Sequence, residues 1–311
     1  MTGTRDVLVV GGGGYIGQHL VRRLCASGRQ ITVLDRRPVV PDLTAGVEYV
    51  QGDYAERDLL IKLLDRHQDV IHLAYATVPN TSFQDPLADL LQNLPPMVQL
   101  FAEAAARGNR VLFVSSGGTV YGASDRIPIC EAHPTKPVSP YGVTKLTQEH
   151  YAHLYAATHG LKFICVRPGN AYGEGQQPFT GQGFIPTAMA SAMKGLPIKM
   201  FGENGTVRDY IFITDLTEGI CCALERGGLS ETYNIGTGTG RSNREIIDVL
   251  RPLMKEIDCN IIVENLPERV FDVKANVLDS TKLREHTGWE PQVDFAEGLI
   301  RTRDWLRSFY A

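Results

Sequence analysis

The 311-residue chain has no long apolar run and no strongly basic segment. No apolar stretch approaches the roughly 18 residues that a membrane-spanning helix needs, and the N-terminus lacks the basic-then-apolar pattern of a signal peptide. The net charge is −4 and basic residues do not cluster into long runs, which argues against nucleic acid as a main partner. We therefore expect a cytoplasmic protein that binds neither membranes nor nucleic acid.

Cysteine is also scarce, and its spacing carries no metal signature. Six cysteines occur without a Cys-x-x-Cys pair or a Cys/His ligand pattern, so we predict no metal site. Cys221 and Cys222 are adjacent, which is poor geometry for a structural disulfide bond. This usage is typical of reduced thiols in a cytosolic protein.

What is present is an alternation of short apolar runs and helical segments, in a chain with an ordinary 43% of hydrophobic residues. This alternation, with its short connections, predicts a doubly wound parallel sheet with helices on both faces. The third helix should be broken or kinked at Pro95-Pro96. The predicted strands are residues 6–10, 30–35, 47–52, 69–74, 110–116 and 162–167, and the predicted helices are residues 15–27, 56–66, 85–107 and 140–159.

The rhythm changes after Pro168. Residues 169–183 are rich in glycine and show no period, so we expect a loop over a site. We assign a nucleotide-binding domain to residues 1–168, with returning segments at about 207–240. Residues 169–311 form mainly a smaller α/β domain for the substrate. Within it Ser242 should cap a helix that runs to Lys255.

A glycine-rich turn follows the first predicted strand. Gly11, Gly14 and Gly17 are spaced G-x-x-G-x-x-G, and Tyr15 and Ile16 open the helix. Glycines let the backbone approach a pyrophosphate, which then sits on the helix N-terminus. The turn therefore predicts a dinucleotide site, and the alternative is a tight turn without a ligand.

Carboxylates end the next two strands. Asp35 lies 18 residues after Gly17, where it can accept from both ribose hydroxyls and repel a 2′-phosphate, so we predict NAD. Arg36 and Arg37 follow directly and leave NADP open. Asp53 ends the third strand, where it either meets the adenine or caps the next helix.

Tyr141 and Lys145 are spaced one helical turn apart and share a face. A nearby ammonium and a positively charged nicotinamide would lower the pKa of the tyrosine toward the working range, and the lysine can hold the nicotinamide ribose. Alone this spacing is a common surface pairing. Behind a glycine turn it predicts redox chemistry with Tyr141 as the proton-transfer group.

With these motifs the chain resembles the extended short-chain dehydrogenases/reductases, in particular the nucleotide-sugar 4-epimerases of the UDP-galactose 4-epimerase type. The resemblance implies a Rossmann sheet and a smaller C-terminal substrate-binding domain, with Leu73 and Ala74 at the cofactor. The matching stretches run from Gly11 to about Asp272 and include residues 70–74, 115–122, 139–145, 167–170, 201–202 and 208–211.

The same resemblance places the contacts of a UDP-sugar substrate. Asn170 and Arg208 are similar to residues that meet the pyrophosphate, although Arg208 could instead form a surface ion pair with Asp209. Lys199 and Phe201 look like the uridine contacts. Arg269 and Asp272 resemble the pair that holds the nucleotide end.

One position departs from the family pattern. The family usually has serine or threonine four residues before the tyrosine of Val120-Tyr121-Gly122, and this chain has Gly117. The missing hydroxyl is expected from Thr119 first, with Ser116 as the second candidate or as a structural serine. Gly118 and Thr119 also lack the acidic residues that family dehydratases and decarboxylases place here, which argues against both reactions.

The resemblance also suggests a substrate and an assembly. Asn276 takes the place of a residue that walls the sugar pocket, and its small size favours UDP-GlcNAc and UDP-GalNAc, alongside the UDP-glucose pair. The expected reaction is NAD-dependent 4-epimerisation. Another 4-keto reductase or dehydratase, or a non-catalytic dinucleotide sensor, is the alternative. We expect a homodimer through residues 85–107 and 140–159, unless these apolar stripes face the sheet.

Overall fold

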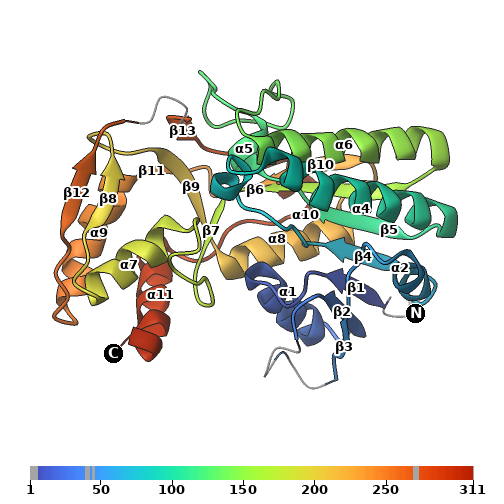
Figure 1. Cartoon of the computed structure of the whole chain (residues 1–311), viewed down its shortest axis with the longest axis horizontal. Helices are drawn as coiled ribbons and strands as arrows, with labels where there is room; N and C mark the ends of the chain where they lie inside the picture. The colour runs from blue at the N-terminus through green and yellow to red at the C-terminus, as the bar shows by residue number, and fades with distance from the viewer. Residues whose placement is uncertain (1–5, 39–42, 44–45, 269–272, 311) are drawn as a thin grey trace.

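The computed structural model describes residues 6–38, 43, 46–268 and 273–310. Seven parallel strands form its main sheet, in the order β10-β6-β5-β4-β1-β2-β3 (Figure 1). The predicted doubly wound sheet is therefore confirmed. The strands are β1 (Val7–Val10), β2 (Ile31–Asp35), β3 (Glu48–Gln51), β4 (Asp69–His72), β5 (Arg110–Val114), β6 (Lys162–Pro168) and β10 (Glu231–Ile235).

Helices cover both faces of this sheet. On one face α1 (Tyr15–Ala26) packs on α8 (Ile213–Arg226), and on the other α4 (Pro86–Arg107) packs on α6 (Pro140–His159) and on α2 (Arg57–Leu64). Alternate residues of β1 supply the two cores, because successive strand side chains point to opposite faces. Val7 and Val9 join the first core, and Leu8 and Val10 join the second.

Helix α4 excludes the break that was one of the two outcomes predicted at Pro95-Pro96. It is a single 22-residue helix with Pro95 and Pro96 inside it, not two helices separated by a break. Each proline removes one backbone donor. The following residues Met97, Leu100 and Phe101 are fully buried in the core, and this packing compensates for the missing hydrogen bonds.

A second, smaller unit lies beside the carboxyl ends of the parallel strands (Figure 1). Its four-stranded sheet has β11 (Gly240–Ser242), β9 (Val207–Phe212) and β13 (Ala275–Asn276) in order, with β7 (Asn170–Tyr172) also paired to β9. A further parallel pair joins β8 (Ile198–Phe201) to β12 (Val263–Leu266). The helices of this unit are α7 (Phe184–Met193), α9 (Asn243–Lys255) and α11 (Phe295–Tyr310), whereas α10 (Thr281–Thr287) packs on α8 and β10 of the larger unit.

Local sequence explains how α9 begins. The Ser242 hydroxyl accepts from the N–H of Glu245 at 3.1 Å, and the Glu245 carboxylate accepts from the N–H of Ser242 at 2.6 Å. This reciprocal capping box confirms the predicted cap. Across the part of the chain that the structure describes, no helix is long and apolar enough to cross a membrane.

Candidate active site

Two connected hollows run along the carboxyl edge of the parallel sheet. A groove of about 400 Å³ lies over the ends of β1 and β2, and a cavity of about 1060 Å³ continues from it toward the smaller unit. Gly11, Gly14, Leu73 and Tyr75 line both, which makes the two hollows one site. A carboxyl edge of this kind is where ligands of doubly wound sheets bind.

The glycine turn forms a cradle in which side chains have no room. Gly11 has φ +85°, and a Cβ there would lie 2.7 Å from the N of Ala74. A Cβ on Gly17 would lie 2.5 Å from the carbonyl oxygen of Gly11. Gly14 precedes α1 without a side-chain cap, so the first N–H groups of the helix remain available to an anion. Gly14, Tyr15, Ile16 and Gly17 all line the cavity, as a pyrophosphate requires.

Asp35 lies against this turn. Its Oδ2 accepts from the N–H of Gly13 at 2.9 Å and its Oδ1 from the N–H of Arg37 at 3.0 Å. The carboxylate is thus held at the groove, where the sequence places the ribose. The Arg37 guanidinium donates to the carbonyl of Gly13 at 3.3 Å.

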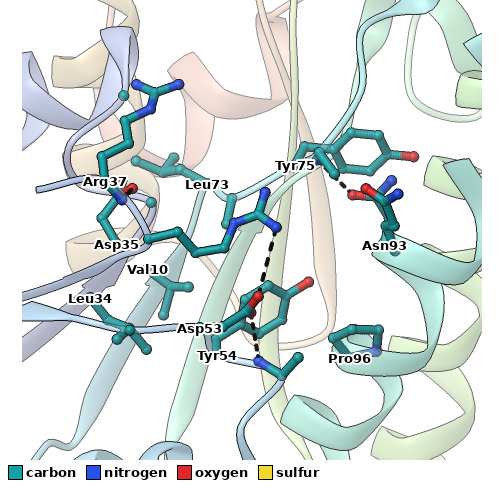
Figure 2. A pocket seen from close by; sticks show the side chains of 18 of the residues that line it. Val10, Leu34, Asp35, Arg37, Asp53, Tyr54, Leu73, Tyr75, Asn93 and Pro96 are labelled. Carbon is teal, nitrogen blue, oxygen red and sulfur yellow. Dashed lines mark hydrogen bonds and ion pairs between the residues drawn. The ribbon is translucent and has the colours of Figure 1, made fainter. Parts of the chain in front are cut away.

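The far end of the groove holds Asp53, for which the sequence left two roles open, and two residues that the sequence motifs did not indicate (Figure 2). Asp53 accepts from the N–H of Ala55 at 2.9 Å, so it caps the turn before α2 while it also lines the groove. Arg36 lies 3.7 Å from the Asp53 carboxylate, in a largely exposed ion pair. Tyr54 and Pro96 add apolar surface that the motifs did not reveal.

The predicted reactive pair lies on one face of α6. Lys145 is buried, and its Nζ donates to the carbonyl oxygen of Val114 at 2.7 Å, at the end of β5. The same Nζ lies 4.0 Å from the ring centroid of Tyr75 and 5.8 Å from that of Tyr141. Burial lowers the pKa of Lys145 to about 7. The ammonium is therefore close to its titration point near neutral pH.

The side chains around Tyr141 do not by themselves lower its pKa. Burial raises the pKa of Tyr141, and the charge of Asp89 raises it further, while a hydrogen bond with the Ser116 side chain lowers it. The prediction that Lys145 would lower this pKa missed the cost of burying a phenolate, which is the largest effect here. The tyrosine is a phenol until another positive charge is brought close.

Ser116, the second candidate, is the hydroxyl that reaches Tyr141. The first candidate, Thr119, lines the cavity with its Oγ1 buried and without a partner among the described residues. The one-turn helix α5 (Gly117–Val120) sets both positions, and no periodicity in the residues indicates this helix. Thr119 thus lines the cavity, and within the part of the chain that the structure describes its hydroxyl forms no hydrogen bond to the tyrosine.

Steric crowding explains why glycine occupies position 117. A Cβ at this position would lie 2.5 Å from Cδ1 of Leu278 and 2.9 Å from the carbonyl oxygen of Arg167. Its own carbonyl accepts from Nδ2 of Asn276 at 3.0 Å. Asn276 is 1% exposed and is not among the residues that line the described cavity. The expected place of Asn276 in the sugar wall is therefore not supported, because strand β13 turns its amide toward α5.

The predicted substrate residues divide into two groups. Asn170, Lys199, Phe201 and Arg208 all line the cavity. Arg269 and Asp272 lie outside the described residues.

Backbone carbonyls hold the guanidinium of Arg208. Its Nη1 donates to those of Val207 and Val273, each at 2.8 Å. Asp209, the expected surface partner of Arg208, is instead buried and accepts from Thr237 and from the N–H groups of Gly238 and Leu278.

Sequence reasoning missed two residues beside the reactive pair, Tyr75 and Asp89. Tyr75 follows the end of β4, and its ring meets that of Tyr141 edge-on with centroids 4.8 Å apart. Asp89 is completely buried on α4. The sequence contains a feature that could have identified each of them. Tyr75 follows a strand whose carboxyl end lies at the site. Asp89 shares a helical face with the apolar residues that follow it.

A parallel nucleotide-binding sheet, a glycine cradle and a Tyr-Lys pair at one cavity define an extended short-chain dehydrogenase/reductase. The family model described as NAD dependent epimerase/dehydratase family matches residues 7–236. The chain belongs to this family, and its cofactor is NAD.

Individual relatives cover nearly the whole chain. It is 33% identical to UDP-glucose 4-epimerase of Mycolicibacterium smegmatis, over 97% of this chain and 98% of the relative. It is 30% identical to dTDP-4-dehydro-6-deoxyglucose reductase of Escherichia coli, over 94% and 95%. The solved structure of Thermus thermophilus UDP-glucose 4-epimerase in complex with NAD matches 97% of this chain and 99% of that chain, with a TM-score of 0.88 and 32% identity.

Proposed function

We propose that this enzyme is a UDP-hexose 4-epimerase that works through a 4-keto sugar. The observation that carries the proposal is the continuity of the site: Tyr141, Ser116 and Lys145 lie in the same cavity as the guanidinium of Arg208. A substrate anchored by its pyrophosphate at Arg208 can extend its sugar to Tyr141. The kinship with enzymes named UDP-glucose 4-epimerase supports this reaction.

The protein residues divide the work. Tyr141 takes the proton of the sugar 4-hydroxyl and later returns it, while Ser116 hydrogen-bonds the tyrosine. The positive charge of Lys145 favours the phenolate form of Tyr141 at that moment. The glycine turn would hold NAD, which would supply the acceptor for the hydride that leaves C4 of the sugar and the donor that returns it. Arg208 and Asn170 hold the pyrophosphate while the keto sugar rotates to present its opposite face.

The sugar itself is a finer question. The preference for UDP-GlcNAc and UDP-GalNAc rested on Asn276, whose amide is bound to Gly117. We therefore propose that the enzyme accepts the N-acetylated pair and the glucose pair, and that Thr119, which lines the cavity, contacts the sugar.

Product analysis tests the proposal. Purified protein is incubated separately with UDP-GlcNAc, UDP-GalNAc, UDP-glucose and UDP-galactose, without added cofactor, and the products are separated by chromatography and identified by NMR. We expect each accepted sugar to reach an equilibrium mixture with its 4-epimer, with no net change in NADH absorbance. Failure to convert any of the four sugars would overturn the proposal.

A 4-keto reductase is the second candidate, since one relative is named dTDP-4-dehydro-6-deoxyglucose reductase. A reductase consumes one NADH or NADPH for each 4-keto sugar reduced, which an epimerase does not. Incubation of the protein with a 4-keto-6-deoxy nucleotide sugar and NADH distinguishes the two. Stoichiometric loss of NADH absorbance without any epimerase activity would establish the reductase.

We also propose that two copies pair through α4 and α6. Large apolar side chains stay exposed on these helices, including Leu87, Leu91, Val143 and Leu154. Sedimentation equilibrium of the double variant Leu91→Glu/Val143→Glu should show a monomer where the wild type is a dimer. Leu229→Glu, at an equally exposed apolar residue elsewhere, is the control and should stay dimeric.

A further inference from the structure

A buried carboxylate beside the reactive pair has no part in the proposed proton transfer. Asp89 on α4 is 0% exposed. It accepts a hydrogen bond from the hydroxyl of Thr77, in the segment after β4, and another from the hydroxyl of Thr144 at 2.7 Å. Thr144 directly precedes Lys145 on α6. Asp89 thus ties together the segments that carry Tyr75, Tyr141 and Lys145.

Anchoring alone does not require a charge here. One turn further along α4, Asn93 accepts from the N–H of Ala76 at 2.8 Å and donates to the carbonyl of Asp89 at 2.7 Å. Gln148 on α6 donates to the carbonyl of Asn93 at 3.1 Å. Neutral amides therefore already join the same segments. A buried carboxylate is costly by comparison, because an ionised group loses favourable hydration when it is buried.

The charge of Asp89 acts on the titratable groups of the reactive cluster. It raises the pKa of Tyr141, after the larger effect of burial, and it does the same for Tyr75. It also opposes the lowering of the Lys145 pKa that burial causes. All three effects have one direction: a fixed anion favours the ammonium of Lys145 and disfavours phenolates.

Tyr75 completes the arrangement. Its ring lines the cavity, and the Nζ of Lys145 is 4.0 Å from its centroid. A cation over an aromatic face is attracted by the ring quadrupole, most strongly where water is excluded. Tyr75 and Asp89 therefore both favour the charged form of Lys145, through contacts on different elements.

We propose that Asp89 is a positioning residue of the reaction, which favours the charged form of Lys145 against the Tyr75 ring and the protonated form of Tyr141 until the cofactor and substrate are bound. Thr77 and Thr144 hold the carboxylate in place. The other titratable groups around the cluster are His72 on β4, Cys165 on β6 and Glu149 on α6, and all of them act on, or are affected by, Lys145.

The test is the variant Asp89→Asn, which keeps the shape of the side chain and removes its charge. Loss of the anion lowers the pKa of both Tyr141 and Lys145, so both limbs of the bell-shaped pH profile of kcat/KM should move to lower pH by about one unit, the size expected for the loss of one nearby buried charge. Thr144→Val is the matched control. It removes one hydrogen bond and keeps the charge, so kcat should fall severalfold while both limbs stay in place.

A second readout needs neither substrate nor cofactor. Ultraviolet difference titration follows tyrosinate formation, and subtraction of the same curve for Tyr141→Phe isolates Tyr141. We expect its ionisation to begin at lower pH in Asp89→Asn than in the wild type. Identical titration curves and identical pH profiles would overturn the inference and leave Asp89 a structural residue.

Two further variants guard against a failure to fold. In the triple variant Asp89→Leu/Thr77→Val/Thr144→Val no hydroxyl or carboxylate is left unpaired, and it should show the same shift as Asp89→Asn. Tyr75→Leu removes the ring and should move the alkaline limb alone, whereas Tyr75→Phe keeps the ring and should keep the limb. The activity profiles rest on the proposed reaction. The titration does not, so an enzyme with another substrate would still show the shift.

Discussion

Two buried cations near the site, Lys145 on α6 and Arg167 on the neighbouring strand β6, are treated in opposite ways. Lys145 has a backbone carbonyl and an aromatic ring as its near contacts. Arg167 donates to both oxygens of Glu149 and to the hydroxyl of Tyr121 at 2.8 Å. Burial lowers the pKa of Arg167, but the hydrogen bonds and charge of Glu149 outweigh this and raise it.

This difference distinguishes the Glu149–Arg167 cluster, which stabilises the fold, from Lys145, which lies at the candidate active site. Every donor and acceptor of a buried network must be satisfied for the network to be stable, and the Glu149–Arg167 cluster meets this condition, with Ser115 and Asn234 adding further bonds. Lys145 is held at a pKa of about 7, where its charge responds to its surroundings. The protein stabilises the permanent charge of Arg167, and it leaves the charge of Lys145, which acts in the proposed reaction, free to change.

Removal of the reacting hydroxyl should give the largest effect. Tyr141→Phe is expected to lower kcat about 10³-fold, the usual scale for loss of a general acid–base group, with NAD affinity and melting temperature nearly unchanged. Tyr155→Phe, on the same helix but outside the cavity, is the control and should keep full turnover. A variant of Tyr141 with wild-type kcat would remove this residue from the reaction.

Breaking the scaffold cluster should instead cost stability. Glu149→Ala leaves Arg167 buried without its carboxylate, and denaturant unfolding should show a loss of about 3–5 kcal/mol. The double variant Glu149→Leu/Arg167→Met removes both charges together and should recover most of this loss. If the single variant were as stable as the wild type, the cluster would not differ from the Lys145 site in the way described.

Removal of the Lys145 charge should stabilise the protein near neutral pH, whereas removal of the Glu149 charge should destabilise it. Its pKa in the folded protein, about 7, lies below its ordinary value of 10.5, so between these values the folded state binds fewer protons than the unfolded state. The free energy of unfolding of the wild type should therefore rise with pH over this window. Lys145→Met should be more stable than the wild type at about pH 7, lose that advantage toward pH ~10, and turn over poorly. Urea unfolding at both pH values measures the difference.

The smallest expected effect is the loss of stability caused by a substitution at Gly117. Gly117→Ala should cost about 1–3 kcal/mol, because the new Cβ meets Leu278 and a backbone carbonyl. Leu278→Val in the same chain should recover part of the loss, since the nearer clash is with the end of the leucine side chain. Thermal unfolding of the single and double variants checks this, and equal melting temperatures for Gly117→Ala and the wild type would contradict it.

Patterns that are local in the sequence predicted most of the fold. The strand before Gly11, the helix that opens at Tyr15 and the shared face of Tyr141 and Lys145 all depend on residues within a few positions of one another. Of the two outcomes predicted at Pro95-Pro96, a break or a kink, the break does not occur, because tertiary packing of α4 overrides the local cost of proline. The short helix α5 was missed because one turn has no periodicity to detect.

The site was less predictable where it depends on contacts between distant segments. Asn276 reaches Gly117 across 159 positions, and Asp89 meets Thr144 across 55. Residue type suggested a hydroxyl near Tyr141, but only the course of the backbone after β5 distinguishes Ser116 from Thr119. A pKa shift depends on three-dimensional burial, which explains why the sequence did not reveal that the protein groups around Tyr141 raise its pKa.

The order of the strands carries a consequence for how the two units move. The chain leaves the large sheet after β6, returns after β9 through α8 and β10, and leaves again for β11. The walls of the cavity are thus joined by several separate connectors, so any opening that admits a sugar nucleotide must bend all of them together. A cut after Pro168 would also remove β10 and α8 from the sheet, and neither half would keep a closed core.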